Sequence, residues 1–281
     1  MPIELKRTRN TFSRLGRQLS QLRKSTSPEA VHKFRTASRR VETVLGEVVC
    51  DPSSNDKKLL KRLAGLRQKA GKIRDLDVQV ATLAALKISG GNGDKTKLLE
   101  SLVAQRLKGE KKLARAYGHK VERDLRQRLA RSAKQLDRIK DSVPFSLAEN
   151  RLAQLAKDHG PLTEKKLHAY RIVGKRARYI AELDSHDPQA KLLIGKLKPA
   201  QDVIGDWHDW LKMTQKAQDL LGGARDSALV AMLQNVTRAK YRQALDAVAG
   251  MRTFLAKPVA SQDAPQRKSP ARREIHSRVA A

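Results

Sequence analysis

Apolar residues recur along the chain at spacings of three and four, and this helical period is the feature that most constrains the fold. One stripe comprises Leu59, Leu63, Leu66, Ala70 and Ile73. A second comprises Val31, Phe34, Val41, Leu45 and Val48. Strict alternation of apolar and polar residues, the period of a half-buried strand, is almost absent. The sequence therefore predicts an all-α protein.

Prolines and a glycine-rich segment divide the helical pattern. Prolines stand where helices should begin or be separated, at Pro28, Pro52, Pro144, Pro161 and Pro188. The run SGGNGD at 89–94 is a clear break. We expect helices at about 3–24, 28–49, 55–88, 94–141, 145–159, 162–184, 187–221 and 224–255.

A cationic motif occurs twice, at positions 136 residues apart. Residues 32–40 read HKFRTASRR and residues 168–176 read HAYRIVGKR, so both follow His-x-x-Arg-x-x-x-(Arg/Lys)-Arg. Positions i, i+3 and i+7 share one face of a helix, which stacks His32, Arg35 and Arg39 together. Cations stacked this closely repel one another. A chain that builds the stack twice is predicted to have a polyanion as its partner.

The duplication extends beyond this motif. GKIRD at 71–75 matches GDWHD at 205–209, at an offset of 134. We therefore expect one domain over 1–256, built as two tandem four-helix bundles at about 1–141 and 145–256. If these halves pack about a pseudo-twofold axis, the two motif helices meet at a basic central groove.

Positive charge dominates the part of the chain that is expected to fold. The formal net charge is +30 over 281 residues. Residues 257–281 carry six Lys and Arg against two Asp and Glu, a net of +4, which leaves +26 for the rest. This tail, rich in Pro, Ser and Arg, is expected to be disordered. The charge balance favours anionic partners.

Other features of the composition narrow the kind of partner. Aromatic residues make up 4% of the chain, which weighs against base stacking and favours backbone phosphate as the target. The single cysteine, Cys50, excludes an intramolecular disulfide and a Cys-based zinc cluster. No run of about 18 apolar residues is present, and the N-terminus lacks the apolar stretch of a secretory signal. We therefore expect a soluble cytoplasmic protein that does not contact a membrane.

The cations of the first motif lie to one side of the apolar stripe on their helix. With Phe34 at the centre of the apolar face, Arg35, Arg39 and His32 fall at about 100° to 160° from it. One such helix alone would be interpreted as a solvated basic face. The duplication, with the histidine kept at the head of each copy, favours a binding face.

The next helix of each half carries cations close to its apolar stripe. Arg62 and Lys69 lie about 40° to 60° from Leu66, and Lys196 takes the place of Arg62 in the second half. Such cations can snorkel outward and be structural. The interpretation favoured here is that they line a cleft between the halves.

The same helices end with a second paired feature, Arg74-Asp75 and His208-Asp209. The two aspartates are interpreted as structural residues or as supports for the neighbouring cation. Arg74 and His208 could contact the anion, and the sequence favours this role no more than a position away from it. Trp207, beside His208, is interpreted as a packing residue.

Metal binding and catalysis find little support in the sequence. His32, His168 and His208 have Arg and Lys as neighbours, which would repel a divalent cation. There is no P-loop, no G-x-S-x-G and no H-E-x-x-H motif. No acidic cluster near the basic motifs would hold the Mg²⁺ that phosphoryl transfer needs. We expect a binding protein with no cofactor, no metal and no enzymatic activity.

These residues resemble the CHAD family, the conserved-histidine α-helical domain. The resemblance rests on VHKFRTASRRVETVL and LRQKAGKIRDLDV in the first half, and on LHAYRIVGKRARYIAEL and QDVIGDWHDW in the second. It covers about residues 3–255. It implies two four-helix bundles related by a pseudo-twofold, and binding of inorganic polyphosphate in a basic central groove or pore, in some members at polyphosphate granules. The E-x-E-x-K motif of the triphosphate-tunnel domain fused to many relatives is absent, so the activity of those fusions does not carry over.

The resemblance also implies which residues contact polyphosphate. The first-half ligands are His32, Arg35, Arg39 and Arg40. Their second-half counterparts are His168, Arg171, Lys175 and Arg176. A further set follows with less support: Arg62, Lys69, Arg74, Lys196 and His208. Lys175 departs mildly from the motif, because lysine keeps the charge of arginine and loses its bidentate fork.

Two other functions stay open. The composition also permits a nucleic-acid-binding helical protein, in which the basic tail could contact any polyanion. A metal-dependent phosphohydrolase that uses the histidines is the less favoured alternative.

Overall fold

The computed structural model describes residues 3–87, 92–156, 160–184, 186–223 and 225–256, and these residues form helices and no strand. The all-α class is thereby confirmed, whereas the predicted tail at 257–281 lies outside the described residues. The α-helices are α1 (Leu5–Lys24), α2 (Pro28–Thr43), α3 (Ser54–Ala85), α4 (Asn92–Ala116), α5 (His119–Lys134), α6 (Pro144–Ala156), α7 (Glu164–Ala181), α8 (Pro188–Leu221) and α9 (Ala228–Ala256). A π-helical turn, η1 (Val44–Val48), follows α2, and a 3₁₀ turn, η2 (Leu136–Ile139), follows α5.

Helix starts follow local capping chemistry. The Ser27 side chain caps α2, which has Pro28 at its first position, and Asp187 caps α8 ahead of Pro188. α3 begins with a capping box, in which the side chains of Ser53 and Asp56 each accept a hydrogen bond from the other residue's backbone N–H. These are the boundaries that a short stretch of sequence can specify.

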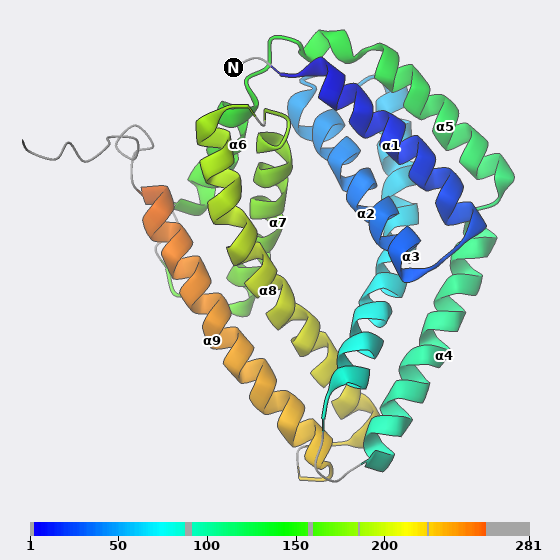
Figure 1. Ribbon diagram of the computed structural model, residues 1–281, viewed down its shortest axis with the longest axis vertical. Helices are drawn as coiled ribbons and strands as arrows, with labels where there is room; N and C mark the ends of the chain where they lie inside the picture. Colours follow the sequence, from blue (N-terminus) through cyan, green and yellow to red (C-terminus); the bar gives the residue numbers. More distant parts are fainter. Residues whose placement is uncertain (1–2, 88–91, 157–159, 185, 224, 257–281) are drawn as a thin grey trace, which may run out of the picture.

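The single helix predicted over 94–141 is wrong, because the chain breaks at Tyr117 and Gly118. Gly118 has an extended backbone and precedes the first residue of α5. Tyr117 is 4% exposed, and its hydroxyl donates to the backbone carbonyl of Leu19 at 2.9 Å. This contact with α1 lets α5 turn back along α1, as Figure 1 shows. The first half therefore contains five α-helices and the second half four.

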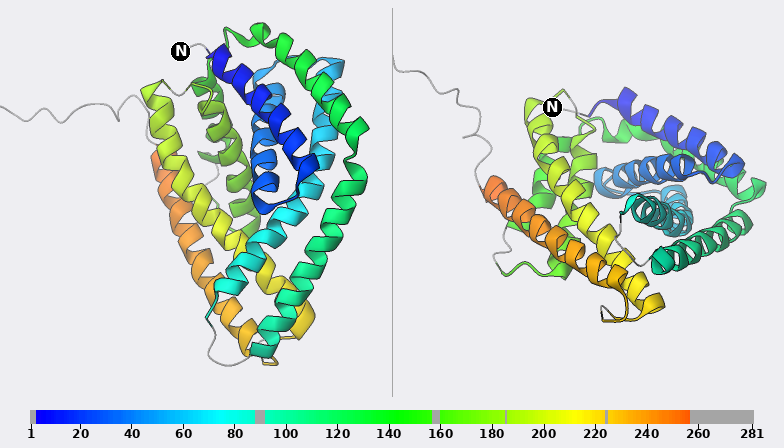
Figure 2. Two further views of the ribbon diagram at one scale, coloured as in Figure 1. Left: turned by 45° about the vertical axis from the view of Figure 1, so that its right-hand side comes forward. Right: turned by 60° about the horizontal axis from the view of Figure 1, so that its bottom comes forward.

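Three apolar clusters hold the fold together. One lies within the first half, around Phe12, Phe34 and Leu63, and a second lies within the second half, around Tyr170 and Trp207. A third joins the halves at the tip, where α3 and α4 meet α8 and α9. The two long helix pairs converge there in every view, while α2 and α7 lie side by side farther from the tip (Figures 1 and 2). The motif helices thus meet between two separately packed halves.

None of the described helices combines the length and the apolarity needed to cross a membrane.

Candidate anion-binding site

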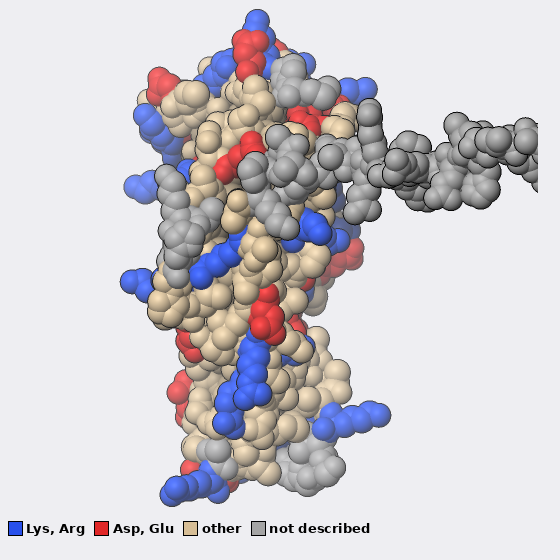
Figure 3. Space-filling view, turned by 90° about the vertical axis from the view of Figure 1, so that its left-hand side faces the viewer, with Lys and Arg blue, Asp and Glu red and all other residues tan. Residues whose placement is uncertain are grey.

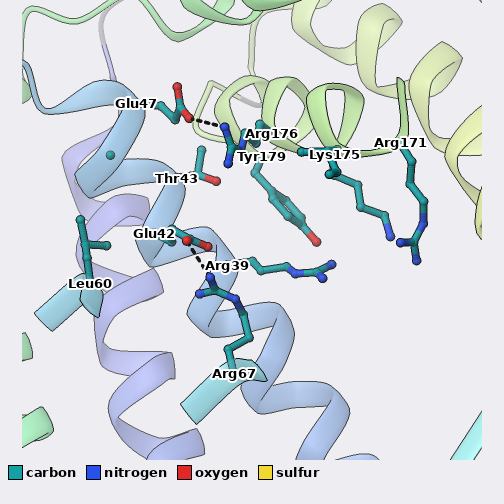
Figure 4. Close-up of a pocket in the computed structure, with 12 residues that line it drawn as sticks. Arg39, Glu42, Thr43, Glu47, Leu60, Arg67, Arg171, Lys175, Arg176 and Tyr179 are labelled. Atoms are coloured by element: carbon teal, nitrogen blue, oxygen red, sulfur yellow. Dashed lines mark hydrogen bonds and ion pairs between the residues drawn. The ribbon is translucent and has the colours of Figure 1, made fainter. Parts of the chain in front are cut away.

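The two copies of the cationic motif lie on α2 and α7, which pack against each other at the junction of the halves (Figure 1). Arg39 from α2 and Arg171, Lys175 and Arg176 from α7 line one cavity of about 460 Å³. Figure 4 shows Arg39 extending across this cavity toward the ends of Lys175 and Arg171. The structure therefore brings the second cations of both motifs to one place.

The cations of this cavity are crowded and partly withdrawn from water. The pKa of Lys175 is lowered to about 7, first by burial and then by the positive charges of Arg171, Arg39 and Arg178. The negative charge of Asp209 opposes this shift and is outweighed. Arg35, one turn before Arg39, does not line the cavity, but burial likewise lowers its pKa to about 10, with added repulsion from Arg39. Like charges from both halves thus act on one another across the junction.

A second group of titratable residues lies beside the first. Burial lowers the pKa of His208 to about 4, and Arg171, Lys212, His168 and Lys175 lower it further. The rings of His168 and His208 have their centroids 5.6 Å apart. At neutral pH His208 is therefore uncharged, and its ring can donate one hydrogen bond.

The histidine of the first motif has a similar environment. Burial lowers the pKa of His32, and the charges of Arg74 and Arg35 add to that effect. Arg74 is half-buried and close enough to act on His32. The structure thus groups Arg74 with the first motif and His208 with the second.

Two aspartates supply the opposing charge. Burial raises the pKa of Asp209, and the negative charge of Asp75 raises it further, while Arg171 lowers it. Asp75 in turn favours the charged forms of Arg35 and Arg171. Their interpretation as supports for neighbouring cations agrees with this arrangement.

Other predicted ligands are held in ion pairs. Nη2 of Arg40 lies 2.8 Å from Oε2 of Glu182, and Nη1 of Arg176 lies 3.5 Å from Oε1 of Glu47. Arg176 still lines the cavity. Arg40 does not line it; its guanidinium instead lies over the ring of Tyr179.

Three predicted cations lie elsewhere. Arg62 faces α5, where its Nη1 lies 2.7 Å from Oδ2 of Asp124. Lys69, seven residues later, shares this side of α3, and both Lys69 and Lys196 are exposed and do not line the cavity. The structure therefore does not place Arg62, Lys69 or Lys196 in the cleft. An apolar stripe has two edges, and the sequence does not say which of them faces the other half.

Arg67 is a cation of the cavity that was not predicted from the sequence. Its guanidinium donates to Glu42 Oε1 at 2.6 Å and to Ser38 Oγ at 3.4 Å, and it lines the cavity from α3 (Figure 4). Arg67 stands four residues before Gly71 and eight before Asp75, on the face of the second paired feature. That spacing was the signal that could have identified it.

Metal ligands do not gather in the described part of the chain. No group of three or more His, Cys, Asp or Glu side chains there is arranged to hold a metal ion. The donors of the cleft are instead guanidinium, ammonium and imidazole groups, which bind anions through charge-assisted hydrogen bonds.

Positive charge is not confined to this cleft. On the face that carries α9, Lys and Arg side chains occur over the whole height of the molecule, interspersed with Asp and Glu (Figure 3). The cleft differs from that surface because most of its cations are partly buried and act on one another. Crowding, and not charge alone, marks it as the candidate site.

Fold and cleft together define an all-α domain whose two related halves present paired cations at their junction. The chain belongs to the CHAD family, because the model of the CHAD domain matches residues 7–214. The resemblance seen in the sequence is confirmed.

Solved structures show the same fold. The crystal structure of the CHAD domain from the plant Ricinus communis matches with a TM-score of 0.64 and 20% identity, over 89% of this chain and 89% of that chain. PptA from Streptomyces chartreusis matches with a TM-score of 0.66 and 16% identity, over 91% of this chain and 99% of that chain. The comparison with curated proteins finds no match.

Proposed function

We propose that this protein binds inorganic polyphosphate in the cleft between α2 and α7. One observation carries the proposal: cations from both halves meet at one cavity, where burial and then mutual repulsion lower their pKa values, that of Lys175 to about 7. Bringing like charges together in a partly buried place destabilises the folded protein. A polyanion that enters the cleft relieves this repulsion and replaces the lost hydration with charge-assisted hydrogen bonds.

The placement of the cations around the cavity suits a linear chain of phosphates. Cations approach it from three helices: Arg39 from α2, Arg67 from α3, and Arg171 and Lys175 from α7. Arginine forks bind phosphate oxygens in pairs, whereas lysine acts as a point charge. Successive phosphates of one chain can therefore meet cations of both halves.

The aromatic residues favour polyphosphate over nucleic acid. Trp207 is 2% exposed within the core of the second half, and Trp210 packs against the cluster at the tip. Tyr179, which lines the cavity, is 7% exposed. Proteins that hold single strands without sequence preference stack bases on accessible aromatic rings. A ligand that offers phosphates and no bases fits these residues better.

Binding, and not hydrolysis, is the activity proposed. Phosphoryl transfer needs carboxylates that hold Mg²⁺ against the phosphates. The carboxylates that line the cavity are already paired with arginines, Glu42 with Arg67 and Glu47 with Arg176. Because these carboxylates are paired with arginines, the site is better suited to hold its ligand than to cleave it.

The test replaces Arg35, Arg39, Arg171 and Lys175 together with glutamate. The matched control makes the same charge change on the outer helix α5, at the exposed residues Lys120, Arg123, Arg131 and Lys134. Binding of long-chain polyphosphate is measured at fixed salt, with circular dichroism to verify folding. The cleft variant should lose affinity by about 100-fold or more, since several phosphate contacts are lost together.

Equal losses in both variants would show that only net charge matters and would refute the site. Competition with double-stranded DNA separates the alternative function. If DNA displaces polyphosphate at equal phosphate concentration, the result supports a nucleic-acid-binding function and refutes the proposal.

A further inference from the structure

Two equivalent glycines lie beside the first arginine of each motif. Gly71 on α3 lies against Arg35, and Gly205 on α8 lies near Arg171, at the offset that relates the two halves. A Cβ atom on Gly71 would overlap Nη1 of Arg35 and would lie 3.3 Å from Cζ and 3.7 Å from Nη2. The guanidinium of Arg35 therefore occupies the space that a side chain at position 71 would need.

Other glycines of the same helices have no such neighbour. A Cβ on Gly65 of α3 or on Gly195 of α8 meets nothing within 4 Å. Glycine inside a helix is less favourable than alanine, so its presence at position 71 carries a cost. The close approach of Arg35 is the packing reason that the structure gives for a glycine there.

Arg35 is also held in this place by its neighbours. Its Nη1 donates to the backbone carbonyl of Arg67 at 3.2 Å, and the charge of Asp75, one turn after Gly71, favours its charged form. Arg67 is itself fixed by Glu42. The guanidinium thus rests on the backbone of α3, where it donates to a carbonyl oxygen and is attracted by the charge of Asp75.

The second half is built more loosely at the matching position. A Cβ on Gly205 would lie 4.0 Å from Nε of Arg171, which is an ordinary van der Waals distance. Nε of Arg171 is buried and makes no hydrogen bond within the described part of the chain. Arg171 is therefore less constrained by α8 than Arg35 is by α3.

We propose that Gly71 is a positioning residue for polyanion binding: it holds Arg35 as a fixed cation beside the cavity, whereas Arg171, which lines the cavity, is the adjustable one. The inference rests on the proposed function. A pre-positioned guanidinium loses less conformational freedom on binding, so Arg35 contributes more affinity than a mobile arginine would. The adjustable Arg171 then adapts to the spacing of the phosphate chain.

Four single variants test this: Gly71→Ala, Gly205→Ala and the controls Gly65→Ala and Gly195→Ala. Alanine has the higher helix propensity, and the group displaced at position 71 is the end of a flexible side chain, so all four are expected to fold. Calorimetric titration with polyphosphate of defined length should show a loss of about 10-fold or more for Gly71→Ala, a smaller loss for Gly205→Ala, and less than about 2-fold for both controls.

A double-mutant cycle with Arg35→Lys separates positioning from a structural effect. Lysine ends near the position of Cζ and lacks Nη1, so adding Gly71→Ala to Arg35→Lys should cost little further affinity. If the losses of affinity in Gly71→Ala and Arg35→Lys multiply in the double variant, the two residues act independently and the inference is overturned. Wild-type affinity in Gly71→Ala would also overturn it.

A measurement without ligand distinguishes this inference from the proposed function. The guanidinium ¹H–¹⁵N signal of Arg35, assigned from its absence in Arg35→Lys, should move in Gly71→Ala and stay in place in Gly65→Ala. An unmoved signal overturns the positioning role even where polyphosphate binds. A wild-type protein that fails to bind polyphosphate refutes the proposed function, whatever this signal does.

Discussion

We predict that Lys175 makes the affinity for polyphosphate depend on pH. Its pKa is about 7 because it is buried and because Arg171, Arg39 and Arg178 repel its charge. Its counterpart in the first motif is Arg39, so the second motif has an ammonium where the first has a guanidinium. With a pKa of about 7, Lys175 gains or loses its proton near neutral pH.

The magnitude follows from the two pKa values. A bound phosphate chain supplies negative charge and returns the pKa of Lys175 toward its ordinary 10.5, so binding takes up a proton above pH 7. With full restoration, the affinity falls by about 10-fold per pH unit well above pH 7, and by about 50-fold between pH 7 and pH 9. Partial restoration gives a smaller slope of the same sign.

The stability of the free protein changes in the opposite direction. In the unfolded chain Lys175 has its ordinary pKa of 10.5, so between pH 7 and 10.5 the unfolded state binds more protons than the folded state. The contribution of Lys175 to the free energy of unfolding therefore rises with pH through that window. Weaker binding at high pH thus cannot be attributed to unfolding caused by this residue.

The assay is calorimetric titration at several pH values between 6.5 and 9, in two buffers of different ionisation enthalpy, so that proton uptake is measured directly. The control is Lys175→Arg, which keeps the charge and does not titrate in this range. The wild type should take up close to one proton near pH 8, and the variant much less. Equal proton uptake and equal pH slopes in the two proteins would refute this reasoning.

Two further predictions concern the second histidine and the core. His208→Gln should leave affinity at pH 7.5 nearly unchanged, because the pKa of His208 is about 4 and its ring is neutral there, but should reduce the gain in affinity below pH 6; calorimetric titrations extended below pH 6 measure this. Leu63→Ala, at a fully buried position of the first core, should lower the free energy of unfolding by about 2–5 kcal/mol in urea denaturation without a proportionate change in polyphosphate affinity. A loss below about 1 kcal/mol would contradict the packing described for this cluster.

Local signals in the sequence predicted the helices and the opposition of the two motifs. Ser27 with Pro28, and the apolar stripe through Leu63 and Ala70, act within one or two helical turns, so they can be recognised without a tertiary structure. The break at Tyr117 could not be recognised, because a hydrogen bond to α1 accompanies it. The pseudo-twofold packing of the halves stays a prediction.

The part of the site that could be predicted from the sequence is the helix face that both copies of the motif share. Arg39 and Lys175 reach the cavity because their motif face is the one turned toward the other half. Arg40 is the next residue along, and its engagement by Glu182, far away in the sequence, leaves no local signal. The prediction that Arg62 lines the cleft was wrong for a related reason, because its acidic partner lies on α5, a helix that was not predicted separately.

Cations from the two motifs are proposed to form one anion site, and a crystal structure of the protein grown with polyphosphate tests this most directly. We expect a continuous chain of phosphate density between α2 and α7, in contact with Arg39, Arg171 and Lys175. Density on the outer surface alone, with that cleft empty, would contradict it.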